Sequence, residues 1–167
     1  NNLKISYSPI KNTLHYFLHC PKALAKVQVY NEKNSLKFSA IFTDENDYFD
    51  PNFENDLLSN NLIKSALPNL IMSNENIELA EKINLNEIIK KLSTYKNKSI
   101  VEMIYDKNKN LTVILLNQDI TSSIFLGNGM WLEKELKLRS VLDYLDRENK
   151  IPNKINIENI NKVILKF

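Results

Sequence analysis

The sequence predicts an α+β fold, dominated by an antiparallel sheet with helices packed on one face. Short apolar stretches separated by polar breaks recur from residue 25 to the end of the chain, and several alternate apolar with polar residues. Two other segments, around residues 85–92 and 131–147, carry apolar residues at helical spacing. With 167 residues, of which 43% are hydrophobic and 25% charged, the chain is long enough to bury one core or two small ones.

Composition excludes several classes of protein. The chain has 22 basic and 20 acidic residues, a net charge of +2, and no cluster of Lys and Arg, so we predict no nucleic-acid partner. Its one cysteine, Cys20, excludes an intramolecular disulfide. No apolar run approaches the roughly 18 residues of a membrane-spanning helix. The sequence opens at Asn1, which leaves room for an anchor upstream of it.

The N-terminal quarter predicts one strand, one helix and one hairpin. Leu3–Tyr7 alternates as a short strand does. Pro9 suits the first turn of a helix, and apolar residues at helical spacing predict that this helix runs to His19. Residues 25–30 and 36–42 then form two alternating stretches around a polar tetrapeptide, which predicts an antiparallel hairpin.

The middle of the chain predicts a loop followed by a helix. Residues 43–61 are acidic and rich in Asn, and Leu67-Pro68 predicts an extended bend. A helix could start between Glu75 and Lys82, and Asn84 is also placed to cap a helix, with Glu87 three residues on. The apolar stripe of that helix consists of Leu85, Ile88, Ile89 and Leu92.

The last third reads as three strands, a helix and two strands. Residues 100–105 and 111–116 predict a hairpin, and 123–127 a third strand. Both glycines of the chain, Gly127 and Gly129, follow that strand and predict a turn with positive φ. The helix runs from Trp131 to about Arg147, and the closing strands cover 155–157 and 162–167. The residues expected on the apolar face of this helix are Leu132, Leu136, Val141, Leu142 and Leu145, with Glu133, Lys134, Lys137, Arg139 and Asp143 largely elsewhere.

Residues that could carry chemistry are few. His15 and His19 would share one face of the predicted helix, as in zinc sites, but Cys20 projects about 100° away and no third ligand is present. Cys20 lacks an oriented base, and the acidic stretch 44–50 lacks the spacing of a calcium loop. We therefore predict no metal, no cofactor and no catalytic residue, and a protein that is not an enzyme.

Two features leave alternatives open. Trp131 is either an exposed anchor for a partner or, as its place favours, the residue that packs the helix onto the sheet. The closing stretch 162–167 has high β propensity and no Pro, which is typical of an edge strand. Such an edge either receives a strand from a partner or is simply paired in the sheet, with its lysines protecting the edge.

The order of these elements resembles the extracytoplasmic region of the bacterial cell-division protein family FtsQ/DivIB. The resemblance covers most of the chain and is best from about Ile100 onward. The sequence departs from the family at Asn156 and Glu158, where the family's closing strands have Asp and Arg. The segments that carry the resemblance are the hairpin 100–116, Ser123-Ile-Phe-Leu-Gly127, the helix 132–145, the closing pair 155–158 and 162–167, the stretch 21–42, Tyr48-Phe-Asp50 and Leu67-Pro68.

The resemblance implies a non-enzymatic docking scaffold of the divisome. Residues 1–43 would be a POTRA-like N-terminal part and residues 44–167 the family's β domain. The chain would lie outside the cytoplasmic membrane, anchored by a single transmembrane segment not in this sequence. Its partners would be small coiled-coil division proteins of the FtsB/DivIC and FtsL types. A partner would add a strand to the sheet edge that the last strands of the chain form. The implied partner-binding residues are Asn161, Lys162, Val163, Ile164, Leu165, Lys166 and Phe167, with Arg139 and Tyr144 on the helix surface 136–144.

A function of another class remains as the alternative. An exported surface lipoprotein or adhesin that binds a host or envelope ligand would fit the same composition. A transmembrane helix upstream in the full-length gene favours the scaffold, and a lipid-modified cysteine motif favours the alternative.

Overall fold

The fold is known from a computed structural model. It describes the backbone of residues 2–8 and 13–19, and residues 21–31, 33, 35–52, 55, 58–59, 67–73, 77–93 and 95–167 with their side chains. Within those residues, no helix combines the length and the hydropathy needed to span a membrane.

The described chain is mostly strand, with two helices between strands. The first half contains β1 (Asn2–Ser8), β2 (Thr13–His19), β3 (Ala23–Tyr30), β4 (Leu36–Thr43), β5 (Tyr48–Phe49) and β6 (Asn69–Met72). The second half contains α2 (Leu79–Ser93), β7 (Lys98–Tyr105), β8 (Asn110–Asn117), β9 (Ile120–Asn128), α3 (Trp131–Arg147), β10 (Lys154–Asn159) and β11 (Lys162–Lys166).

Nine of these strands form one mixed sheet in the order β11-β10-β9-β8-β7-β6-β3-β4-β5. The α+β class is confirmed. Five neighbouring pairs are antiparallel, whereas β3–β6, β6–β7 and β9–β10 are parallel, so antiparallel pairing is only part of the architecture. The parallel pairs arise where a helix or a long connection returns the chain to the starting end of the sheet.

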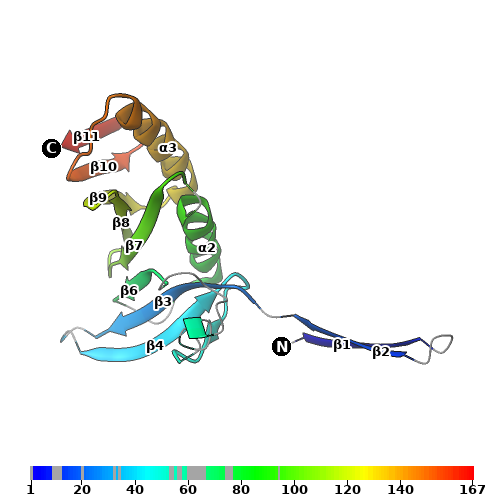
Figure 1. Ribbon diagram of the computed structural model, residues 1–167. Coiled ribbons are helices and arrows are strands. Elements are labelled where there is room, and N and C mark those ends of the chain that lie inside the picture. Colours follow the sequence, from blue (N-terminus) through cyan, green and yellow to red (C-terminus); the bar gives the residue numbers. More distant parts are fainter. Residues whose placement is uncertain are drawn as a thin grey trace.

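Both helices cover the same face of this sheet (Figure 1). Chain direction explains why. The crossovers β6–α2–β7 and β9–α3–β10 start from strands that run the same way, and both step toward β11. Right-handed crossovers of that kind place their helices on one side. The opposite face, which we call the open face, carries half-buried and exposed side chains in β7, β8, β9 and β11.

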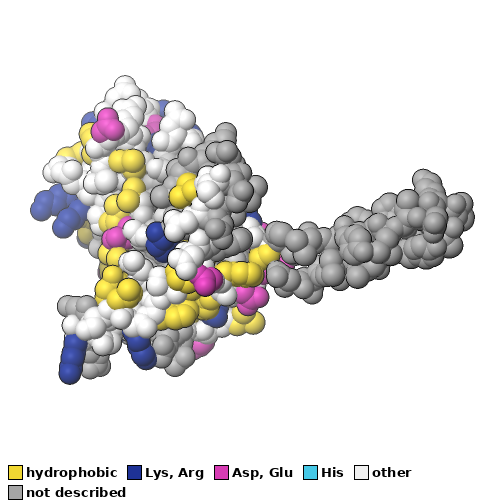
Figure 2. Space-filling view, turned by 60° about the horizontal axis from the view of Figure 1, so that its bottom comes forward, with side chains coloured by type: hydrophobic (Ala, Val, Ile, Leu, Met, Phe, Trp, Pro, Cys, Tyr) yellow, Lys and Arg dark blue, Asp and Glu magenta, His cyan; other side chains and the backbone are white. Residues whose placement is uncertain are grey.

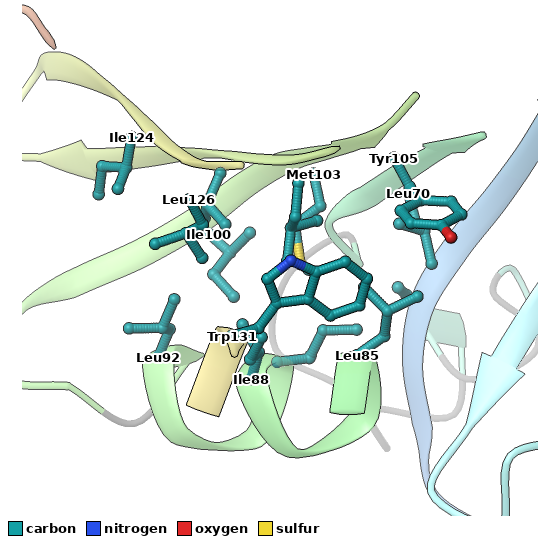
Figure 3. Packing of buried hydrophobic residues seen from close by; sticks show 14 of the residues in the cluster. Leu70, Leu85, Ile88, Leu92, Ile100, Met103, Tyr105, Ile124, Leu126 and Trp131 are labelled. Carbon is teal, nitrogen blue, oxygen red and sulfur yellow. The ribbon is translucent and has the colours of Figure 1, made fainter. Parts of the chain in front are cut away.

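The main core lies between the helices and the sheet (Figure 3). The stripe expected on α2 is confirmed, since all four of its apolar residues are buried. In the same layer, the Trp131 indole lies edge-on to Tyr105, with ring centroids 5.6 Å apart. Trp131 is 4% exposed and therefore packs the helix onto the sheet, as its position favoured. Sheet residues that complete this layer include Leu70, Ile100, Met103, Ile124 and Leu126.

The structure corrects three predictions about elements. The helix expected up to His19 is wrong, because Thr13–His19 is a strand paired with β1. Asn84 is not a cap, because α2 begins five residues earlier at Leu79. On α3, Leu136 is 60% exposed, whereas Leu138 and Lys134 are buried.

Sheet pairing does not divide the chain at residue 43. β3 pairs with β6, and β4 continues the same sheet, so residues 23–43 belong with the strands that follow them. Only β1 and β2 form a separate two-stranded sheet, which Figure 1 draws beyond the β3–β4 end.

Candidate docking edge

β11 is the outermost strand at one end of the nine-stranded sheet. It pairs antiparallel with β10, with Lys166 opposite Lys154, Leu165 opposite Ile155 and Ile164 opposite Asn156. The register shifts between Asn156 and Asn159, where β10 bulges. The edge position expected for the closing strand is thus confirmed. A strand paired on one side alone leaves half of its backbone N–H and C=O groups facing outward.

The two faces of β11 differ in chemistry. Val163 and Leu165 are half-buried and pack against the main core, so they face the helices. Lys162, Ile164 and Lys166 alternate with them and are exposed on the open face. The Ile164 side chain is 52% exposed, and that of Phe167, just beyond the strand, is 61% exposed.

The turn before β11 is fixed by asparagine side chains. The backbone N–H of Asn161 donates to Asn159 Oδ1 over 2.9 Å, and that of Glu158 donates to Asn156 Oδ1 over the same distance. Side-chain bonds of this type satisfy backbone donors locally. The hairpin therefore presents β11 in one register rather than as a fraying terminus.

The outer surface of α3 offers apolar side chains near the same end of the molecule. Leu136, Ser140 and Tyr144 are four residues apart and lie along one stripe of the helix. Leu136 is 60% and Tyr144 is 49% exposed. Figure 2 turns the β3–β4 end of the sheet toward the viewer, and in that view a band of hydrophobic side chains crosses the visible face, with Lys and Arg side chains at its margins.

Arg139, expected on the same surface, is committed to internal contacts. Its Nε donates to Glu135 Oε1, and its terminal NH2 donates to the carbonyl oxygen of Lys91 over 2.9 Å. Its guanidinium carbon also lies 5.7 Å from the centre of the Tyr95 ring. Glu135 is completely buried. Arg139 therefore ties α3 to the end of α2, and we leave it out of the docking surface.

The N-terminus of α3 is anchored through the glycine turn. Gly127 and Gly129 both have φ of 63°, which confirms the predicted positive-φ turn. The indole Nε1 of Trp131 donates to the Gly127 carbonyl over 2.8 Å. The Lys134 ammonium donates to the carbonyls of Leu126 (2.7 Å) and Asn128 (2.9 Å). Burial lowers the pKa of Lys134. Nothing in the sequence distinguished Lys134 from the other charged residues of this helix, so its burial was not predicted.

The C-terminal half of α3 is held by a charged network. Asp143 accepts hydrogen bonds from the Tyr95 hydroxyl and, over 2.6 Å, from the Lys96 ammonium. Asp146 accepts from the buried Lys98 at 2.7 and 2.8 Å. Lys96 and Tyr95 lower the pKa of Asp143, and burial together with Asp143 raises the pKa of Tyr95 to about 12. These contacts fix α3 against the start of β7.

A polar hollow of about 290 Å³ lies beside this network. Its lining includes Lys96, Lys98, Asp146 and Lys150, with the amides of Asn117 and Asn149. Lys96 and Lys98 share Asp146, Lys96 also pairs with Asp143, and the Lys150 ammonium lies 3.9 Å from a carboxylate oxygen of Glu148, so each of these lysines has a carboxylate partner. The described residues that line the hollow include no Ser, Thr, Cys or His.

The His and Cys cluster considered as a metal site in the sequence falls on side chains that the structure does not describe. The side chains of His15 and His19, and Cys20 as a whole, lie outside the described residues, and the helix that would have aligned the two imidazoles is a strand. Elsewhere, the described part of the chain holds no group of three or more metal-ligating side chains.

In comparisons with known proteins, no family model matches the chain, and no curated protein matches it at a significant level.

Proposed function

We propose that this chain is a non-enzymatic docking scaffold of the bacterial divisome. It recruits small coiled-coil division proteins of the FtsB/DivIC and FtsL types, one of which adds a strand to β11. The observation that carries the proposal is the position of β11 at the end of the sheet, with Ile164 and Phe167 more than half exposed. Strand addition uses the outward backbone groups for affinity and the exposed side chains for specificity.

Helix α3 supplies the second part of the proposed surface. The exposed Leu136 and Tyr144 lie on an element that packs against β10, the neighbour of β11, and against β9 beyond it. A partner that leaves β11 as a helix would find apolar side chains there. Hydrogen bonds from Lys134 to the Leu126 carbonyl and from Arg139 to the Lys91 carbonyl fix α3, and with it these side chains, before any partner binds.

The same proposal assigns a place in the cell. The chain lies on the extracytoplasmic side of the cytoplasmic membrane, and a single transmembrane segment outside this sequence anchors it. The region before β3 is proposed to contribute to a POTRA-like part. The sequence resemblance to FtsQ/DivIB is the support for these statements.

Binding of the purified FtsB/DivIC ectodomain tests the proposal. The full chain is compared with a variant lacking residues 161–167, after circular dichroism establishes that both are folded. We expect binding by the full chain alone. Equal binding by both forms would contradict strand addition at β11, and binding by neither would favour the surface lipoprotein or adhesin.

Point variants avoid the risk that truncation exposes the core. The Ile164 side chain is 52% exposed and the Tyr144 side chain 49%. We therefore expect Ile164→Glu and Tyr144→Ala to leave the fold intact. We expect each to weaken partner binding by roughly tenfold or more if it lies in the centre of the interface. Ile120→Glu is the control, because Ile120 is a comparably exposed apolar residue, at 46%, and lies at the start of β9.

A further inference from the structure

The open face of the β10–β11 hairpin carries positive charges that no carboxylate of the described residues pairs with. Lys162 and Lys166 project from β11, and Lys154 lies directly opposite Lys166 on β10. Like charges directly opposite one another in a sheet repel. The amino groups of these three lysines form no ion pair with any described carboxylate.

Acidic residues near the hairpin do not relieve this repulsion. Glu158, the one acidic residue from Lys154 to the end of the chain, lies against Gly127, its Cγ 2.9 Å from where a Cβ would stand there. Following the register from Lys154 across the sheet leads to Ser123, then Ile114, then Glu102. Three strand spacings put Glu102 about 14 Å away, beyond the range of unscreened attraction at physiological salt.

A tenth strand would face these lysines directly. Residues of that strand opposite Lys162 and Lys166 lie on the open face, four positions apart, and the residue between them lies opposite Ile164. A carboxylate opposite Lys166 would offset one of the two positive charges of the Lys154–Lys166 pair and reduce their repulsion. An apolar side chain opposite Ile164 would cover a residue that is 52% exposed.

We propose that the partner segment of β11 is an acidic strand of the pattern acidic–x–apolar–x–acidic, with its carboxylates opposite Lys162 and Lys166. This inference rests on the proposed strand addition and adds the chemistry of the partner. The lysines then have two roles. They keep the free edge from pairing with other copies of itself, and they select a partner of opposite charge.

Three synthetic peptides test the proposal. Each is a nine-residue β-forming peptide of the pattern above, with Glu, Gln or Lys at the two charged positions and an otherwise identical sequence. Binding is followed by backbone NMR of the full chain, which detects weak complexes and reports whether the β11 amides shift. We expect the Glu peptide to bind roughly five- to tenfold more tightly than the Gln peptide, and the Lys peptide more weakly still.

Charge reversal on the protein supplies the matched control. In Lys166→Glu the preference for the Glu peptide should be lost, and in Lys162→Glu with Lys166→Glu it should reverse in favour of the Lys peptide. Lys107→Glu makes the same change of net charge on the exposed turn between β7 and β8, and should leave the preference unchanged. Raising the ionic strength should narrow the difference between the peptides.

The outcomes separate this inference from the function on which it rests. Shifts at β11 that are equal for the three peptides would overturn the acidic pattern while supporting strand addition. Absence of binding by all three would overturn both. A preference that follows the net charge of the protein, and so changes equally in Lys107→Glu, would also overturn the pattern.

Discussion

At the scale of single residues, the junction between β9 and α3 shows that the residue types of a segment do not reveal which of its charged side chains are buried. Lys134 was expected on the polar side of the helix, yet it is buried and bonded to two carbonyls. Its hydrocarbon stem fills the layer beneath the helix while its ammonium satisfies the turn. Arg139 likewise appeared in the sequence as a surface cation but holds a buried carboxylate.

Gly127 and Gly129 make a matched pair of substitutions. Both have φ of 63°, so alanine at either position adopts a strained backbone costing roughly 1–2 kcal/mol. Only at Gly127 would the new Cβ also meet Glu158, 2.9 Å from its Cγ. We expect Gly127→Ala to lower the free energy of unfolding by about 1–3 kcal/mol more than Gly129→Ala. Urea unfolding measures both, and equal losses would mean that Glu158 moves aside freely.

The buried tyrosines predict a loss of stability at alkaline pH. Burial and a hydrogen bond to Glu81 raise the pKa of Tyr105 from 10.0 to about 12. Between these values the unfolded chain releases the phenolic proton and the native chain keeps it, so the native state binds more protons and stability falls as pH rises. We expect thermal unfolding to shift to lower temperature across this range, and to shift less in Tyr105→Phe.

Ultraviolet absorbance of tyrosinate provides the check on that prediction. Subtracting the absorbance of Tyr105→Phe from that of the native protein at each pH isolates the titration of one phenol among the seven tyrosines of the chain. The pH at the midpoint of this difference curve should lie well above the midpoint for the unfolded chain. A difference curve centred near 10.0, the ordinary tyrosine value, would remove the basis of the predicted pH dependence.

At the scale of elements, periodicity predicted those that are long or strongly patterned. The predicted bounds of α3 and the hairpin β7–β8 agree with the structure to within about two residues. β2 was mistaken for a helix because its apolar residues fit both periods: Leu14 and Leu18 are four apart, which is on one face of either element. β6 gave no usable signal, since a four-residue strand is too short to show a period.

The edge strand of the candidate site could be predicted from the sequence, but the exposed residues of α3 could not. A terminal strand with flanking lysines indicates an edge, and β11 is one. Which residues of α3 face outward was not predictable, because that depends on the position of β9 and β10. Leu136 was assigned to the apolar face on spacing alone, and it is exposed. The opposite position of Lys154 and Lys166 depends on a bulge that no sequence pattern marked.

The pairing of Glu135 with Arg139, one turn apart on α3, can be tested by a double substitution. Arg139→Met leaves the fully buried Glu135 without its cation, and Glu135 Oε2 already has no hydrogen-bond partner in the described structure. We expect Arg139→Met to lower the free energy of unfolding by about 3 kcal/mol. Adding Glu135→Met removes the unpaired charge, so the double variant should recover most of that loss. Additive effects, measured by urea unfolding, would show that the pair is not coupled.

At the scale of the whole molecule, the two sheets are separate units of pairing. β1 and β2 pair with each other, and the nine-stranded sheet begins at β3. The main core consists of residues from Leu24 onward among the described side chains. We expect a variant lacking residues 1–20 to keep a cooperative thermal transition within a few degrees of the full chain.

The denaturant dependence of the free energy of unfolding gives the control for this truncation. The slope of that dependence scales with the surface exposed on unfolding, so the truncation should change the slope only slightly if the first two strands add little to the core. Loss of the cooperative transition would mean that the N-terminal strands are integral to the fold.

From β6 onward the strands lie side by side in the order in which they are synthesised, up to β11. A chain that emerges from the ribosome or from a translocation channel therefore always has a finished template for its next strand, and no later segment must be threaded between earlier ones. Among these strands, β11 is the last to be made and the last to join the sheet. A partner that recognises β11 consequently binds only molecules that have completed their sheet, which makes assembly itself a test of correct folding.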